Sequence, residues 1–165
     1  MVENKRNIKI TSSREGLNEL EAFIEDICYE YNIINTYYSN IQLAINEVFI
    51  NAKEHGNKDN PEACIDISFF SDENGLHFIV QDEGEGFDYQ KYVQSGVDDL
   101  IMDEESESKK GLLVIKMLVD ELNFLNNGNT IELIFYISSI NYTITVERKK
   151  HLENYFKNVI LYKTS

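Results

Sequence analysis

The spacing of apolar residues changes along this 165-residue chain, and the change restricts the fold class. Between residues 12 and 56 they recur every three or four positions, which is typical of amphipathic helices. Between residues 65 and 80 they alternate with polar residues, which is typical of strands with one buried face. Helices grouped with antiparallel strands indicate an α+β protein, and we expect a two-layer sandwich of one sheet with its helices.

The same spacing predicts the individual elements. Apolar stripes mark the two long helices, at Leu17, Leu20, Ile24, Ile27 and Tyr31 in the first and at Ile41, Ile45, Val48 and Ala52 in the second. The expected N-terminal elements are a strand at 8–10, a helix from Ser12 or Ser13 to about Tyr31, and a helix from a capping box near Ser39 to His55-Gly56. A hairpin of strands at 65–69 and 76–80, with its turn at Asn74-Gly75, is expected next. The remaining expected elements are a helix at 112–119 opened by Gly111, a hairpin of strands at 122–126 and 130–138, a strand at 141–147 and a helix at 149–158.

Composition and charge exclude several classes of function. The chain is 42% hydrophobic and 27% charged, as expected of a single globular domain. A net charge of −14 repels phosphate backbones and anionic membranes, so we do not expect a nucleic-acid or membrane-binding protein. Cys28 and Cys64 are too few for a disulfide framework. No signal peptide or long apolar run is visible, and we expect a cytoplasmic protein.

The second expected helix carries the first motif with chemical potential. Glu47, Asn51 and His55 are spaced four residues apart and therefore lie along one edge of that helix. A carboxylate can accept a proton, and an amide oxygen can ligate a hard cation such as Mg²⁺. Taken alone, the pattern is equally compatible with a solvated helix face.

Two glycines follow the strand at 76–80. In the sequence Asp82-Glu83-Gly84-Glu85-Gly86, Gly84 and Gly86 let the backbone approach a ligand and present N–H groups. Asp82 can accept a hydrogen bond from an exocyclic amine. An ordinary glycine-containing turn uses the same residues.

Two further segments could serve an anionic ligand. Lys109, Lys110 and Gly111 precede the expected third helix, whose free N–H groups and dipole favour anions. A plain helix start is the alternative. Gly128 and Thr130 form a turn into the last long strand, where Thr130 either bonds a ligand or serves only as a strand-favouring residue.

Together and in this order, these motifs resemble those of the GHKL (histidine-kinase-like) ATPase superfamily. Within it, the sequence is most similar to bacterial anti-sigma factors that are serine-protein kinases. Residues 47–56 resemble the N box of that family, and residues 82–88 resemble its first glycine box. Residues 110–122 resemble the second glycine box with its following helix, and residues 128–130 resemble the final Gly-Thr turn.

The resemblance covers residues 5 to 137 and implies a Bergerat-type fold, a mixed sheet with helices on one face. The ATPase domain would span residues 1–140, with 141–165 as a C-terminal extension packed on it. ATP would bind between the second helix and a lid at 89–110. The resemblance implies that Asp82, helped by Thr130, would bind adenine and that Gly84 and Gly86 would shape the adenine pocket. Asn51 would ligate Mg²⁺, and Glu47 would activate the attacking hydroxyl or water. The other implied nucleotide-binding residues are His55, Lys109, Lys110 and Gly111.

The resemblance also implies protein partners. The phosphoacceptor domain of histidine kinases is absent, so phosphate would go to a serine or threonine of an anti-sigma factor antagonist. The chain would also sequester a sigma factor. Family members are commonly dimers, which leaves a homodimer open.

Two features depart from the family pattern. Lys109 stands where the second glycine box has its first glycine, and six acids without a base lie within residues 98–107. Two alternatives therefore stay open. One is a partner-switch module that binds ATP without kinase turnover and acts only by sequestration. The other is an acidic interaction protein with a decayed nucleotide site.

Overall fold

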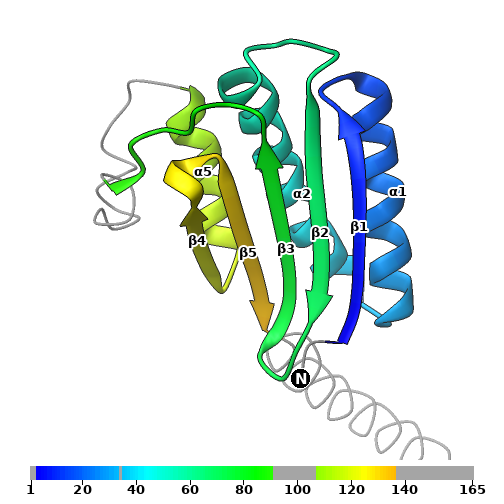
Figure 1. Cartoon of the computed structure of the whole chain (residues 1–165). Helices are drawn as coiled ribbons and strands as arrows, with labels where there is room; N and C mark the ends of the chain where they lie inside the picture. Colours follow the sequence, from blue (N-terminus) through cyan, green and yellow to red (C-terminus); the bar gives the residue numbers. More distant parts are fainter. Residues whose placement is uncertain (1–2, 34, 91–106, 137–165) are drawn as a thin grey trace, which may run out of the picture.

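The computed structural model describes residues 3–33, 35–90 and 107–136, which form a five-stranded sheet with helices behind it (Figure 1). The strand order is β1-β2-β3-β5-β4. In chain order the elements are β1 (Glu3–Thr11), α1 (Arg14–Glu30), α2 (Asn35–Asn51), the π-helical turn η1 (Ala52–Gly56), β2 (Cys64–Ser71), β3 (Gly75–Asp82), α5 (Glu107–Leu118), β4 (Glu121–Leu125), the 3₁₀ turn η2 (Asn126–Gly128) and β5 (Thr130–Tyr136).

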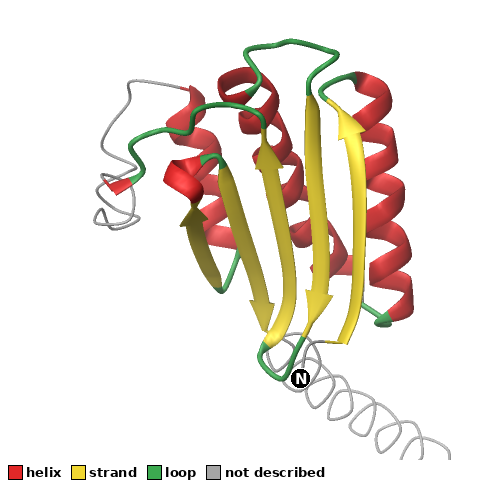
Figure 2. Ribbon diagram, in the orientation of Figure 1, coloured by secondary structure: helices red, strands yellow, loops and turns green. Residues whose placement is uncertain are grey.

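Among the described residues, the α-helices α1, α2 and α5 lie on one face of the sheet (Figure 2). This confirms the predicted α+β sandwich with helices on one face. The four described strand pairings are all antiparallel, whereas the resemblance implied a mixed sheet. The reason is topological. The crossover through α5 places β4 parallel to β3, but β5 lies between these two strands and is antiparallel to both.

The limits of α1 match the prediction, and its cap explains the start. The Ser13 side chain accepts a hydrogen bond from the backbone N–H of Gly16 at 3.2 Å, which satisfies one free donor of the first turn. Leu20, Ile24 and Ile27 of the predicted stripe are fully buried. A Cβ at position 16 would overlap the carbonyl oxygen of Thr11, so glycine allows β1 and α1 to meet at a tight turn.

The second helix starts earlier than predicted. α2 begins at Asn35 rather than near Ser39. Tyr37 and Tyr38 pack against the core, and this packing holds the first turn in place of the expected capping box. At its other end α2 passes into η1, which closes with a 2.7 Å hydrogen bond from Asn57 N–H to Ala52 O. Such π-turns are frequent at functional sites.

The hydrophobic core lies between the sheet and the helices. Phe69, Phe78 and Phe135 come from three adjacent strands, with neighbouring ring centroids 5.0 and 6.0 Å apart. The register pairs Phe69 with Phe78 and Ile65 with Asp82, so these four side chains share the core face of the sheet. The same register therefore places the carboxylate of Asp82 on the core face of the sheet, at the C-terminal end of β3.

The last helix also starts earlier than predicted. α5 begins at Glu107 rather than Gly111, and an acidic residue in a first turn is favoured by the helix dipole. The β4–β5 hairpin follows the prediction, with Asn126-Asn127-Gly128 as its turn. The expected strand at 141–147, the helix at 149–158, the extension at 141–165 and nearly all of the acidic segment lie outside the described residues. Within the described ranges, no helix combines the length and apolar character that a membrane span requires.

Candidate functional site

A cavity of about 260 Å³ opens where the C-terminal end of α2 and η1 meet β3, β5 and α5. Val48, Val80, Leu112 and Ile131 give it apolar walls. Five residues that the sequence singled out also line it, namely Asn51, His55, Asp82, Gly86 and Gly128. The fold therefore brings the first and second motifs together at one site.

Asn51 brings an unsatisfied side-chain atom to the lining of this cavity. Its Nδ2 atom is buried without a hydrogen-bond partner, a condition shared within the described residues only by Oδ1 of Asn46. A buried polar group left unpartnered costs roughly 1–3 kcal/mol. Rotation of the side-chain amide by about 180° exchanges the positions of Nδ2 and Oδ1, so Asn51 can offer either a hydrogen-bond donor or a carbonyl oxygen to a ligand.

Glu47 lies one helical turn before Asn51, next to α5. It is half-buried and does not line the cavity itself. A Cβ at Gly111 would lie 2.9 Å from Glu47 Oε2 and 3.5 Å from Asn51 Oδ1. The absence of a side chain at Gly111 thus lets the backbone of α5 approach both polar groups at the edge of the cavity.

Asp82 is half-buried among glycines. A Cβ at Gly56 would overlap its carboxylate, and Gly84 donates its backbone N–H to Oδ1 at 2.7 Å. Burial raises the pKa of Asp82 above the ordinary value, and the hydrogen bond from Gly84 opposes this shift only in part. The carboxylate is therefore ready to accept a hydrogen bond from a ligand that enters the cavity.

This raised pKa predicts the effect of Asp82→Asn on stability. The ionised carboxylate is disfavoured in the folded protein, so its contribution to stability is full at low pH and is lost as the pH rises through the raised pKa. Asp82→Asn removes the charge, and we expect a higher free energy of unfolding than that of the parent at pH 7. The difference should shrink as the pH falls. Urea unfolding at several pH values measures it, and a difference that is independent of pH would contradict the assignment.

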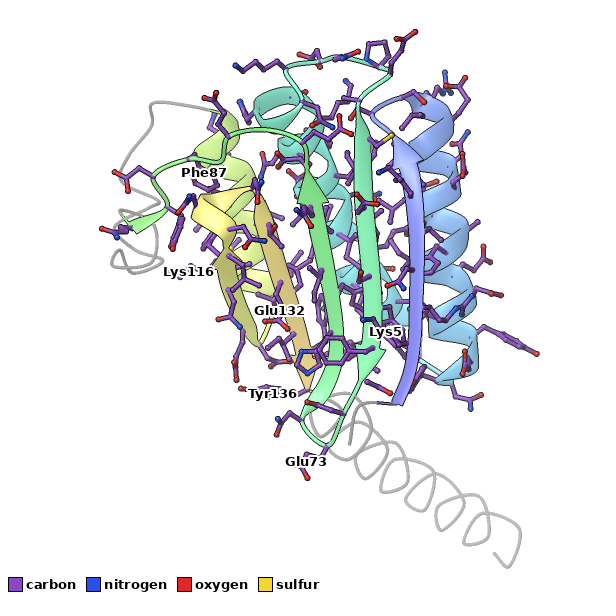
Figure 3. All side chains as sticks on the ribbon, viewed as in Figure 1. Lys5, Glu73, Phe87, Lys116, Glu132 and Tyr136 are labelled. Atoms are coloured by element: carbon purple, nitrogen blue, oxygen red, sulfur yellow. The ribbon has the colours of Figure 1, made fainter. Side chains whose placement is uncertain are left out.

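The loop after Asp82 is wedged against the β4–β5 turn. Gly86 and Gly128 have φ angles of +83° and +92°, and a Cβ at either would overlap or crowd the backbone of the other segment. Phe87, labelled in Figure 3 above β4, donates its N–H to Asn127 O at 3.1 Å and packs edge-on against Phe124. This wedge fixes one wall of the cavity.

Thr130 does not join Asp82 in the cavity. It pairs with Gln81, while its neighbour Ile131 pairs with Val80 in the cavity wall, so Thr130 lies on the opposite face of the sheet. Its hydroxyl donates to Asn129 Oδ1 at 3.0 Å and accepts from Asn126 Nδ2 at 3.1 Å. The structure therefore does not bring Thr130 into direct contact with this site.

The other predicted residues are His55 and the three residues Lys109, Lys110 and Gly111 of α5. His55 is exposed and lines the cavity edge. Lys109 and Lys110 belong to the first turn of α5 rather than to a loop, and the Lys110 side chain is exposed. Gly111 follows within the helix, so the first four residues of α5 now supply the free N–H groups expected near Gly111.

Sequence reasoning missed two asparagines that hold the loop after Asp82. Asn57 Oδ1 accepts the N–H of Glu83 at 2.9 Å, and Asn129 Nδ2 donates to Gly84 O at 3.2 Å. Asn57 follows a glycine that ends a helix, which is a weak signal for a capping role. Nothing in the sequence indicates the distant partners of either side chain.

Comparisons with known proteins give matches over most of the chain. The family model described as histidine kinase-like ATPase domain matches residues 10–135. A protein named serine-protein kinase RsbW from Bacillus subtilis (strain 168) is 29% identical over 135 residues, which are 79% of this chain and 84% of the relative. A protein of the same name from Staphylococcus epidermidis is 31% identical over 101 residues, 58% of this chain and 64% of the relative.

One solved structure shows a similar fold. It contains the RsbU and RsbW domains of Rv1364c from Mycobacterium tuberculosis and is 18% identical, with a TM-score of 0.53. The match covers 81% of this chain but only 32% of that longer chain. At this identity the likeness concerns the fold alone.

Proposed function

The chain belongs to the histidine kinase-like ATPase family, and from this premise we propose that it is a regulatory protein that binds ATP and Mg²⁺ in the cavity beside η1. We further propose that it phosphorylates a serine or threonine of an anti-sigma factor antagonist and sequesters a sigma factor in the cytoplasm. The relatives named serine-protein kinase support this acceptor class. The observation that carries the proposal is the buried, unpartnered Nδ2 atom of Asn51 in the lining of the cavity that Asp82 also lines.

The cavity suits the base of a nucleotide. At about 260 Å³ it is smaller than most pockets for whole ligands, which span roughly 300–1,000 Å³, so the phosphates would lie outside it. Val80 and Ile131 would cover the base, and the carboxylate of Asp82 would accept a hydrogen bond from the exocyclic amine of adenine. Gly84 and Gly86 would shape this pocket. Thr130 would act indirectly, because its hydroxyl bonds the Asn129 side chain that holds Gly84.

The rim of the cavity suits a magnesium-bound triphosphate. Mg²⁺ usually takes one or two protein ligands and fills its shell with phosphate and water oxygens, so the Asn51 amide oxygen is a sufficient anchor. Mg²⁺ held there supplies charge neutralisation on the phosphates. Lys109, Lys110 and Gly111, in the first turns of α5, would lie near the phosphates, and His55 would lie at the edge of the cavity.

Glu47 is proposed as the catalytic base. In the transfer, the hydroxyl oxygen of the partner forms a bond to the terminal phosphorus, and the bond from that phosphorus to the ADP oxygen breaks. Glu47 takes the hydroxyl proton, because its carboxylate lies one turn before the Asn51 amide at the rim.

A second candidate function is ATP-regulated sequestration without phosphoryl transfer. Lys109 favours it, because this lysine stands in the first turn of α5 where the family pattern has a glycine, next to the place proposed for the phosphates.

Calorimetric titration of the protein with Mg-ATP tests the proposal first. We expect binding by the parent and weaker binding by Asp82→Asn, which loses the charged acceptor for the amine. Incubation with labelled ATP and an anti-sigma factor antagonist then separates the two functions. Transfer of the label supports the kinase, and binding without transfer supports sequestration alone. A parent protein that binds no ATP would refute both.

A further inference from the structure

Asn57 is a buried polar residue next to the site, and its side chain uses nearly all of its hydrogen-bonding capacity. It is 6% exposed. Its Nδ2 donates to Ser12 Oγ at 2.6 Å and to Cys64 O at 2.9 Å, and its Oδ1 accepts from Glu83 N at 2.9 Å. One amide thus connects the end of β1, the start of β2 and the loop that follows β3.

The third of these bonds holds the loop that directly follows Asp82. Glu83 is held by Asn57, and Gly84 donates to the Asp82 carboxylate. Asn57 also caps η1, because its backbone N–H bonds Ala52 O at 2.7 Å. The same residue therefore sets where the Asp82 carboxylate lies relative to the η1 backbone, against which it packs at Gly56.

We propose that Asn57 is a positioning residue for base selectivity: by holding Glu83, it fixes the Asp82 carboxylate where it accepts a hydrogen bond from a 6-amino purine and rejects a 6-oxo purine. This inference rests on the proposed nucleotide site and deepens it. A fixed carboxylate discriminates because a 6-oxo group places an acceptor oxygen against an acceptor carboxylate. A loop released from Asn57 can move the carboxylate away from that oxygen, and the discrimination falls.

Two purine nucleotides that differ at position 6 test the inference. The affinities of Mg-ATP and Mg-ITP are measured for the parent, Asn57→Ala, Asn57→Asp and Ser12→Ala. Asn57→Ala should lower the ratio of ATP to ITP affinity by about tenfold. Asn57→Asp keeps an acceptor for Glu83 N–H and should restore most of the ratio.

Ser12→Ala is the matched control, because it removes a partner of the same amide on the side away from Asp82. It should lower stability and leave the ratio unchanged. A merely structural role of Asn57 reduces the folded fraction and weakens both nucleotides equally, so a ratio equal to that of the parent in Asn57→Ala would overturn the inference.

A nucleotide-free measurement separates this inference from the proposed function. Carboxyl carbon NMR of the parent and its variants gives the pKa of Asp82, which burial raises. Asn57→Ala should return it toward the ordinary value by exposing the loop, and Ser12→Ala should not. A parent that binds no ATP refutes the proposed function, and the positioning role is then decided by this titration. An unchanged pKa of Asp82 in Asn57→Ala would refute that role.

Discussion

Glu47→Gln is expected to reduce phosphoryl transfer by about 100-fold or more and to leave the affinity for Mg-ATP within about twofold of the parent. Glu47 is outside the set of residues that line the cavity, so the base would bind as before. Glutamine preserves the shape of the side chain next to Gly111, and only the capacity to accept a proton is lost. The initial rate of label transfer to the partner protein, with calorimetric ATP affinity measured beside it, tests this expectation.

Glu54→Gln is the matched control for that experiment. Glu54 lies seven residues later in η1 and is exposed, so the same chemical change there should alter neither rate nor affinity. Equal transfer rates for Glu47→Gln and the parent would remove Glu47 from the chemistry. A joint loss of rate and affinity would instead place Glu47 among the groups that hold the nucleotide.

Most of the fold could be predicted from local patterns, and the error at the start of α2 has a non-local cause. The limits of α1 follow from Ser13 and an apolar stripe, both of which are visible in the sequence. The start of α2 does not follow from Ser39, because Tyr37 and Tyr38 extend the helix by packing against residues far away in the sequence. A capping signal is overridden where tertiary contacts are stronger.

The candidate site could be predicted where one helix or one loop sets the geometry. The four-residue spacing of Asn51 and His55 places both on the cavity side of the helix, and the run from Asp82 to Gly86 follows a strand that ends at the cavity. The placement of Thr130 depends on the register of β5 against β3, which the sequence does not reveal. Asn57 was missed for the same reason, because its partners lie on three separate segments.

Asn51→Ala is expected to change stability and binding in opposite directions. The substitution removes a buried amide nitrogen that has no partner and introduces the residue with the highest helix propensity, so the free energy of unfolding should rise by about 1 kcal/mol. Loss of the amide oxygen as a magnesium ligand should weaken Mg-ATP by about 10- to 100-fold or more. Chemical unfolding and calorimetry on the same preparation measure both effects.

Asn46→Ala makes that experiment specific. Asn46 lies on the same helix and also has a buried atom without a partner, but its Nδ2 bonds Glu21 and it does not line the cavity. We expect the affinity for Mg-ATP to stay at the parent value in this variant. In a binding site, an unpartnered polar group destabilises the ligand-free protein but is needed to bind the ligand. In a packing defect, such a group only destabilises the protein. Unchanged binding in Asn51→Ala would make Asn51 such a defect, and the magnesium anchor would then have to be sought elsewhere.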